Sequence, residues 1–385
     1  MSSLLIDCRV ARDIRCWPGK GYRLTSQGLR LDAPEPERRG HALTTSGDDP
    51  PLSQLGARIT DTPVPAGSSF PVVPIIVDSV DAGAVPDGVT NWDFFQGALL
   101  AVLVKRPGSE LTVIEGTAVM IAPGLALTAS HVFSDLLPDL ASGKASLGCI
   151  GIRTSGLDIW TVRKVSSSET NDLAYLSLEP LSALTDGWHF SCLQLTTRTP
   201  AVGEELNIVG FRFLDVKERG KDYLAEGDLY AARGEVTATY YPARDAVRMP
   251  FPAIEIACDS LGGMSGGAVL DSESFLVGII SSGYAASEGQ IGTTYAAWVI
   301  GGLNRELEIP WPPGIYSDPT HVLDMPKALL RIVGRDAITI IDGRTIQYRP
   351  WIRHEDQPKI WDPGGAECSA QHEEQGPQLR RLQHE

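Results

Sequence analysis

The chain has 385 residues, of which 43% are hydrophobic and 21% charged, so it can bury a large core in two or three packing units. Its 33 Lys and Arg against 48 Asp and Glu give a net charge of −15 at pH 7. Such an acidic balance argues against nonspecific binding to nucleic acid or anionic membranes. No apolar run reaches the ~18 residues of a membrane helix, and Asp7 and Arg9 interrupt any signal peptide.

The cysteines are scattered, with no C-x-x-C pair, which argues against a metal site. No phosphate loop and no H-E-x-x-H motif occur either, so we expect neither cofactor nor metal. Because no export signal precedes them, the cysteines are expected to be reduced thiols in a cytoplasmic protein. They are Cys8, Cys16, Cys149, Cys192, Cys258 and Cys368.

Residues 1–92 are predicted to form an N-terminal extension that is partly disordered. Up to about residue 70 it is rich in Pro, Gly, Ser and charged residues and has little to bury. The stretch FPVVPIIVDSV, residues 70–80, is expected to be an extended arm. Its prolines allow only an edge strand or irregular packing.

From residue 93 to about 305 the chain reads as two series of short strands. Runs such as LTVIEGTAVMIA and LAYLSL belong to the first series, and LNIVGFRF and FLVGIISSG to the second. Turn residues separate the runs, and no capped amphipathic segment of 10–15 residues lies between them. Close spacing of this kind predicts an all-β barrel or sandwich without crossover helices.

Residues 306–385 are predicted to form a C-terminal extension that begins with a proline-rich link. MPKALLRIV, residues 325–333, favours a short helix with Pro326 near its first turn. AITIIDGRTIQYR, residues 337–349, predicts a hairpin that turns at Asp342 and Gly343. The polar tail from Gln371 is expected to be disordered.

The stretch DSLGGMSGGAVLD, residues 259–271, places Ser265 among glycines. It fits the nucleophile elbow of an α/β-hydrolase, the oxyanion loop of a chymotrypsin-like protease, or a turn without chemistry. The elbow requires an acid and a histidine after the serine; Asp324 and His354 could supply them, but their surroundings show no supporting context. The absence of crossover helices also argues against the elbow.

A base and an acid for Ser265 occur upstream of it. His131 closes an apolar strand–turn–strand, and Asp172 opens an apolar run, so its carboxylate is expected at the rim of a core. Such a carboxylate would orient the imidazole and stabilise the imidazolium. Each residue also has a structural interpretation: His131 packed beside its apolar neighbours, and Asp172 a strand-start cap, with Asn171 competing for the polar role.

The blocks GTAVMIAPGLALTASHV, NDLAYLSL and GGMSGGAVLD resemble those of the trypsin/chymotrypsin-like serine peptidases, and their bacterial branch most of all. The resemblance covers residues 93–305. It implies two six-stranded antiparallel barrels, at about 93–190 and 200–305, with the site between them. It also implies catalytic roles for His131, Asp172 and Ser265, and an oxyanion hole formed by the N–H groups of Gly263 and Ser265.

The same resemblance assigns residues to substrate binding. Ser281 and Gly283 match the strand that pairs with an extended substrate, although Ser281 also fits an ordinary strand serine. Asp259 falls at the floor of the specificity pocket and Thr293 at its wall. The aspartate would favour a basic side chain at the cleavage site, whereas Thr293 would narrow the pocket, so a small or medium apolar side chain fits equally well.

The chain departs from secreted relatives at Met264, which occupies the position of an activating aspartate, and in having no cysteine near His131. Both departures agree with an intracellular protein. The prediction is a serine endopeptidase acting on protein or peptide substrates and regulated by its flanking segments or by a protein partner. The alternative is a catalytically idle binding module with a protease fold.

Overall fold

The computed structural model describes most of the chain from residue 97 to 354. Outside this range it describes only short strands, which are β1 (Leu5–Ile6), β2 (Tyr22–Thr25), β3 (Gly28–Leu31), β4 (Val72–Pro74) and β25 (Gln357–Ile360). Within it, residues 107–111, 154–155, 168–170, 183–187, 220–221, 285–290 and 343–344 are not described. Apart from strands β1 to β4, the expected disorder of the N-terminal extension and of the tail from Gln371 therefore concerns residues outside the described part.

The first barrel contains six strands, and each pairs with its neighbours in antiparallel fashion until the sheet closes. Its order around the ring is β10-β7-β6-β5-β8-β9. The apolar runs of the first series supply these strands and fill the interior. They are β5 (Leu99–Lys105), β6 (Thr112–Ala122), β7 (Leu125–Ala129), β8 (Ser146–Arg153), β9 (Gly156–Ser167) and β10 (Leu173–Pro180).

The second barrel closes in the same way, because its first two strands also pair with each other. Its order is β13-β16-β17-β18-β15-β14, and all six neighbours are antiparallel. The strands are β13 (Glu205–Arg219), β14 (Asp222–Tyr240), β15 (Ala253–Ile256), β16 (Ala268–Leu270), β17 (Leu276–Tyr284) and β18 (Thr293–Trp298). The predicted fold of two six-stranded antiparallel barrels is confirmed.

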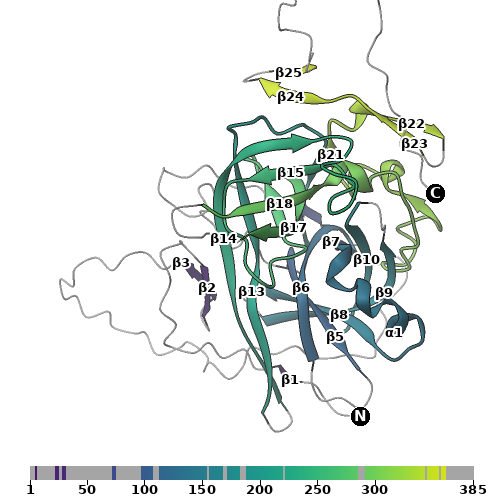
Figure 1. Cartoon of the computed structure of the whole chain (residues 1–385). Coiled ribbons are helices and arrows are strands. Elements are labelled where there is room, and N and C mark those ends of the chain that lie inside the picture. The colour runs from purple at the N-terminus through teal and green to yellow at the C-terminus, as the bar shows by residue number, and fades with distance from the viewer. Residues whose placement is uncertain are drawn as a thin grey trace, which may run out of the picture.

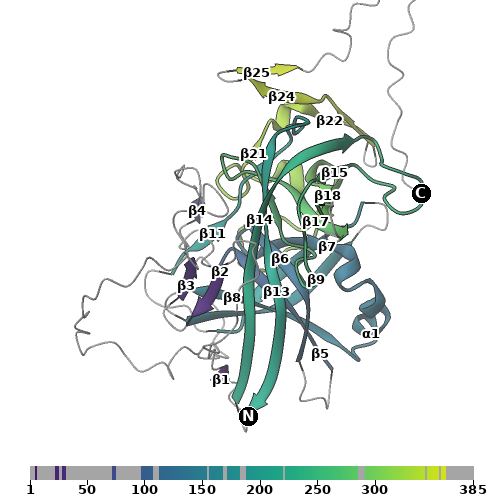
Figure 2. The same cartoon turned by 60° about the vertical axis from the view of Figure 1, so that its left-hand side comes forward.

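The long ribbon of β13 and β14 extends beyond the second barrel and runs alongside the first (Figure 1; Figure 2). Strands β1 and β2 pair with β14 in this ribbon, and β3 pairs with β2. The arm predicted at residues 70–80 contributes β4, which pairs in parallel with β11 (Phe190–Cys192) in a two-stranded sheet. Strand β4 is thus an edge strand, as its prolines require.

Helices are few and short in the described part of the chain. The α-helix α1 (Leu137–Ala141) has five residues, and the 3-10 helices are η3 (Ser130–Val132), η4 (Ser134–Leu136), η5 (Val299–Gly302), η6 (Val322–Asp324) and η7 (Arg335–Ala337). None of the described helices has the length and apolar character needed to cross a membrane. No crossover helix joins the described barrel strands, which rules out the α/β-hydrolase interpretation of the Ser265 loop.

After the second barrel the chain returns to the first. It forms β19 (Glu306–Leu307) and β20 (Thr320–His321), which pair with each other. Between them, the Glu308 carbonyl accepts a hydrogen bond from the Ser177 hydroxyl at 2.6 Å. The Trp311 ring packs edge-on against Trp160 of β9, with their centroids 5.8 Å apart. Buried apolar side chains hold this segment on the first barrel.

The next segment packs against the connection between the barrels. Its strand β21 (Ile332–Val333) runs parallel to β12 (Leu195–Thr196), which in turn pairs with β17. The helix predicted over residues 325–333 is therefore wrong. Pro326 begins only a turn, in which its carbonyl accepts from the N–H groups of Leu329 and Leu330. Burial of Leu330 and Ile332 and pairing with β12 override the helical propensity of this short segment.

The C-terminal strands lie beyond the second barrel in both views (Figure 1; Figure 2). Strands β22 (Ile338–Asp342) and β23 (Thr345–Tyr348) form the predicted antiparallel hairpin. Asp342 ends β22 opposite Thr345, and Gly343 lies outside the described residues. Strand β24 (Trp351–His354) pairs with β25. The indole Nε1 of Trp351 donates to the Thr197 hydroxyl at 2.9 Å, which ties this end of the chain to the connection between the barrels.

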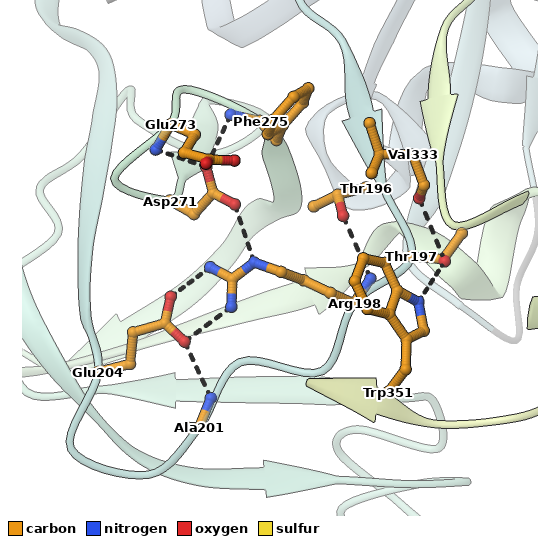
Figure 3. Close-up of polar contacts among 10 residues, drawn as sticks. All are labelled: Thr196, Thr197, Arg198, Ala201, Glu204, Asp271, Glu273, Phe275, Val333 and Trp351. Carbon is orange, nitrogen blue, oxygen red and sulfur yellow. Dashed lines mark hydrogen bonds and ion pairs between the residues drawn. The ribbon is translucent and has the colours of Figure 1, made fainter. Parts of the chain in front are cut away.

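A buried ion cluster, the Arg198 network, joins that connection to the second barrel (Figure 3). The guanidinium of Arg198 donates through Nε to Asp271 at 2.8 Å and through Nη1 and Nη2 to Glu204. Asp271 follows β16 and also accepts from the N–H groups of Glu273 and Phe275. The side chains of Arg198 and Asp271 are only 8% and 2% exposed. Each charge would be costly to bury without the opposite charge of its partner.

Candidate active site

The structure brings His131 and Asp172 together. His131 lies in η3, which directly follows β7, and Asp172 directly precedes β10. These strands pair with each other, with Leu173 opposite Ala129, so the two side chains meet at the end of the pair. His131 Nδ1 lies 2.9 Å from Oδ2 and 3.1 Å from Oδ1 of Asp172.

Several donors hold the Asp172 carboxylate in place. Oδ1 accepts from the backbone N–H of His131 at 3.0 Å, and Oδ2 from the hydroxyl of Ser281 at 2.5 Å. The backbone of Asp172 is left-handed, with φ 45°, and its carbonyl accepts from the N–H of Ser130. A non-glycine residue with positive φ is unusual and is retained here by these surrounding bonds.

Asn171 and Asp172 divide the two polar roles that the sequence left open. The Asn171 side-chain oxygen accepts from the N–H of Leu173 at 3.2 Å, and its amide donates to the Gly301 carbonyl. Asn171 therefore caps the start of β10, and Asp172 faces His131. The His131 side chain is 43% exposed, so it is not the packed histidine of the structural interpretation.

Ser265 lies in a tight turn before β16, and both barrels hold this turn. Its carbonyl accepts from the N–H of Thr117 in β6 at 2.8 Å. The Thr117 hydroxyl donates to the Gly263 carbonyl at 3.0 Å and accepts from the N–H of Phe211 at 2.9 Å. Thr117 thus fixes the turn from the first barrel, a role that sequence reasoning missed. Its only signal was its place in the block that ends at His131.

The Ser265 turn and the His131 turn approach each other at Gly116. A Cβ atom added to Gly116 would lie 2.7 Å from the Ser265 carbonyl oxygen and 2.9 Å from Cγ2 of Val132, the residue after His131. Among the described residues, neither the Ser265 hydroxyl nor His131 Nε2 has a hydrogen-bond partner. A bond between nucleophile and base is often long when no substrate is bound.

The two amides assigned to the oxyanion hole are also uncommitted. Within the described part of the chain, the backbone N–H groups of Gly263 and Ser265 have no acceptor. Gly263 has a φ of 92°, which side chains other than hydrogen rarely permit. Ser265 itself is half-buried. Free N–H groups in a rigid turn can stabilise a developing negative charge on oxygen.

The predicted pocket residues gather beside this turn. The carboxylate of Asp259 lies against Gly292, where an added Cβ would fall 1.8 Å from Oδ1. The backbone of Gly283 lies against the Ser260 hydroxyl, 2.2 Å from an added Cβ, and against the Thr293 carbonyl. Sequence reasoning expected Thr293 at the pocket wall, and in the structure Gly292 and Ser260 also lie among the predicted pocket residues. The only sequence signal for Gly292 was that it has no side chain.

Cys258 adjoins the pocket but is not a nucleophile. Burial raises the pKa of its thiol to about 11, although a contact with Thr294 opposes the rise. The thiol is therefore protonated at neutral pH and buried. The three described cysteines, Cys149, Cys192 and Cys258, are free, in agreement with the expected reduced thiols.

The family comparison identifies the central part of the chain. Residues 116–279 match the model of the trypsin-like peptidase domain. This range begins within β6, contains His131 and Asp172, and ends in β17 after the Ser265 turn. No curated protein sequence matches the chain.

Solved proteases show similarity at low identity. The active form of the Rv3671c protease from M. tuberculosis is 16% identical, with TM-score 0.37, over 63% of this chain and 90% of that one. Deg5 is 18% identical, with TM-score 0.38, over 53% and 85%. The HtrA-type protease AlgW, solved with a decapeptide, is 19% identical, with TM-score 0.38, over 54% and 62%. With TM-scores below 0.5, they add nothing to the fold that strand pairing establishes. By its family match, the segment 116–279 is similar to the trypsin-like peptidase domain.

Proposed function

We propose that this protein is a serine endopeptidase that cleaves peptide bonds with Ser265, His131 and Asp172. The observation that carries the proposal is the pairing of His131 Nδ1 with Asp172, together with a serine turn that Thr117 and Gly116 place against the segment of His131. With Nδ1–H donating to the carboxylate, Nε2 keeps its lone pair for the hydroxyl proton of Ser265. Asp172 also stabilises the imidazolium that results.

The reaction then has two halves. The Ser265 oxygen bonds to the substrate carbonyl carbon as its proton passes to His131 Nε2, and the carbonyl oxygen becomes negative. The N–H groups of Gly263 and Ser265 would stabilise that oxyanion, each contributing about 3 kcal/mol. The C–N bond breaks as His131 protonates the amine, and water, deprotonated by His131, releases the acid from Ser265.

Side-chain preference at the cleavage site is proposed to depend on Asp259. A basic side chain would meet its carboxylate beyond Gly283 and Gly292, which leave room beside it. A small or medium apolar side chain is the alternative if Thr293 narrows the pocket. A digest of a peptide library, with cleavage sites mapped by mass spectrometry, separates the two.

Labelling with a fluorophosphonate probe tests the nucleophile. We expect the full chain to carry one adduct at Ser265, and Ser265→Ala to carry none. His131→Ala should lose the adduct as well, because the serine then has no base. Ser272→Ala, which changes an exposed serine of the same barrel, is the matched control and should label normally. Absence of labelling in every form of the chain would contradict the proposal.

The idle binding module remains the second candidate, because Ser265 and His131 are not hydrogen-bonded to each other in the described structure. Regulation distinguishes a latent enzyme from an idle one. The segment after the second barrel packs against both the first barrel and the connection between barrels, so it is suited to influence the site. If full-length protein stays unlabelled while a triggered or trimmed form reacts, the protein is a latent protease.

A cytoplasmic location is part of the same proposal. It is supported by the free, buried state of the described cysteines, since oxidising compartments favour disulfides. The natural substrate is proposed to be a protein or peptide, and a regulatory protein partner is compatible with the size of the flanking segments. Fractionation of cells followed by blotting for the chain tests the location.

A further inference from the structure

Strand β17 has an open edge next to the candidate site. Its residues from Ser282 to Tyr284 pair with β18 on one side. On the other side, pairing with β16 extends only to Ile279, and no described strand continues it. The open stretch begins at Ser281, whose hydroxyl contacts Asp172, and its last three residues are exposed. An extended peptide can therefore add to this edge by backbone hydrogen bonds.

A fixed cation lies at the far end of that edge. Arg248 Nη1 donates to the hydroxyl of Tyr284 at 3.0 Å. Among the described residues no carboxylate forms an ion pair with Arg248, although the whole chain carries a net charge of −15. An exposed guanidinium held by a tyrosine and lacking a described acidic partner is ready to bind a carboxylate from outside.

The backbone around Arg248 is held by Asp245. Oδ1 of Asp245 accepts from the N–H groups of Val247 at 2.9 Å, Arg248 at 2.6 Å and Met249 at 3.3 Å. Oδ2 accepts from the Arg244 guanidinium at 3.0 Å. These bonds lower the pKa of Asp245 to about 2, and the bond from the Arg248 N–H has the largest effect. The carboxylate is therefore ionised at neutral pH. Arg248 is thus presented by an ordered turn.

Exposed apolar side chains surround the same end of β17. Val247 is 86% exposed, Ile291 75% and Tyr284 56%. Val247 precedes Arg248, and Ile291 precedes Gly292, where an added Cβ would lie 2.8 Å from the Tyr284 carbonyl oxygen. These side chains are far more exposed than large apolar residues usually are, and two of them adjoin Arg248: Val247 in the chain and Tyr284 by its hydrogen bond.

We infer that Arg248 and its apolar neighbours form a subsite that selects substrates with an acidic residue between apolar ones. The apolar neighbours are Tyr284, Val247 and Ile291. The acidic residue would lie about three residues from the scissile bond, on either side of it. The spacing follows from the three-residue step from Ser281 to Tyr284, which spans roughly 10 Å of strand. The inference rests on the proposed function, because it treats the occupant of the open edge as the substrate. The carboxylate would bind the guanidinium, and its neighbours would cover the exposed apolar side chains.

Peptide binding to the full chain carrying Ser265→Ala tests the subsite without turnover. Two fluorescein-labelled octapeptide mixtures are compared by fluorescence anisotropy. One begins with Leu-Glu-Leu and the other with Leu-Gln-Leu, and in both the remaining positions carry an equimolar mixture of residues. We expect the acidic mixture to bind about fivefold more tightly at low salt, as for one favourable ion pair, and less so at high salt.

Variants of Arg248 give the specific signature. Arg248→Gln should remove the preference, and Arg248→Glu should reverse it in favour of a Leu-Lys-Leu mixture. The control Arg106→Gln, which removes a half-exposed arginine at the end of β5 in the first barrel, should keep the preference. Equal binding of the acidic and amide mixtures, or a preference that survives Arg248→Glu, would overturn the inference.

The fluorophosphonate result separates the two proposals. An acidic preference in a protein that never labels at Ser265 would support the subsite and contradict the protease. Labelling at Ser265 without an acidic preference would support the protease and contradict the subsite. Circular dichroism of each variant shows that the fold is retained.

Discussion

At the scale of single residues, the Asp172 carboxylate is the best-defined feature of the candidate site. It accepts from the backbone and the ring of His131 and from the Ser281 hydroxyl, so its orientation is fixed by three donors on two barrels. Sequence reasoning had given Ser281 to substrate pairing. In the structure its hydroxyl donates to the Asp172 carboxylate, and its backbone begins the open edge of β17, so the pairing stays a prediction.

Asp172→Asn tests the role of that carboxylate. An amide in its place can donate to Nδ1 and so favour the wrong imidazole tautomer, which should lower kcat about 10⁴-fold with little change in stability. The measurement is turnover of a peptide chosen from the library digest. Asp336→Asn, an exposed aspartate of η7, is the control and should keep full activity. A loss below tenfold in Asp172→Asn would contradict the assigned role.

The pH dependence of the turn at Arg248 follows from Asp245. Its pKa of about 2 in the folded chain lies below its ordinary 3.8, so the carboxylate stabilises the turn above pH 3.8 and this contribution is lost as the pH falls through 2. Hydrogen exchange of the Val247 and Arg248 amides should therefore show protection at pH 5 that weakens toward pH 2. Asp245→Asn should weaken protection at both pH values. Unchanged protection in this variant would contradict the claim that the Asp245 carboxylate holds the turn.

At the scale of elements, the Ser265 turn depends on glycines that admit close neighbours. Gly266 has a φ of 84°, and a Cβ added there would lie 1.9 Å from the Thr117 carbonyl oxygen and 2.2 Å from the Thr128 hydroxyl. Its N–H donates to the Ile280 carbonyl, which joins the turn to β17. The glycines around Ser265 are thus required for packing between the two barrels, in addition to the catalytic role proposed for this turn.

Gly266→Ala compared with Gly203→Ala measures that requirement. Both glycines have positive φ, but an added Cβ at Gly203 meets no atom within 4 Å. Gly203→Ala should cost about 1 kcal/mol of unfolding free energy from backbone strain alone. Gly266→Ala should cost about 3 kcal/mol or more, because backbone atoms must move as well. Urea denaturation gives both values, and equal losses would mean that the serine turn is not tightly packed.

At the scale of the whole molecule, the C-terminal segment belongs to the body of the protein. Its Trp311 packs on the first barrel, and its Trp351 bonds to Thr197 in the connection between the barrels. Arg198, the residue after Thr197, forms a hydrogen bond with Asp271 (Figure 3). Asp271 directly follows β16, the strand that comes after Ser265. A continuous path of buried contacts therefore runs from the C-terminal segment to the serine turn.

Arg198→Ala should destabilise the whole chain by about 3–5 kcal/mol, because it leaves the buried carboxylate of Asp271 and that of Glu204 without their cation. Arg163→Ala removes an arginine that is 55% exposed and paired with Glu179, and should cost about 1 kcal/mol or less. Urea denaturation of both variants gives the two losses, and similar small values would show that the Arg198 network does not hold the connection to the second barrel.

The fold was predictable because short apolar runs and frequent turns leave few alternatives to antiparallel barrels, and because the His131, Asp172 and Ser265 blocks have recognisable contexts. Other features were not predictable because they depend on tertiary contacts. Residues 325–333 carry a helical pattern, yet pairing of Ile332 beside β12 decides their conformation. Two contacts join segments that are far apart in the chain, and nothing in the sequence indicates that these segments meet. They are the contact of Gly292 with Asp259 and that of Arg248 with Tyr284.

The central claim is that His131 and Ser265 act on one bond at the seam between the barrels. A crystal structure of the full chain after reaction with a phosphonate inhibitor tests it most directly. The account predicts phosphorus bonded to the Ser265 oxygen, a phosphoryl oxygen facing the N–H groups of Gly263 and Ser265, and His131 Nε2 within about 3.2 Å of an inhibitor oxygen or Ser265 Oγ. An unmodified serine, or an imidazole turned away from the adduct and beyond hydrogen-bond reach, would contradict it.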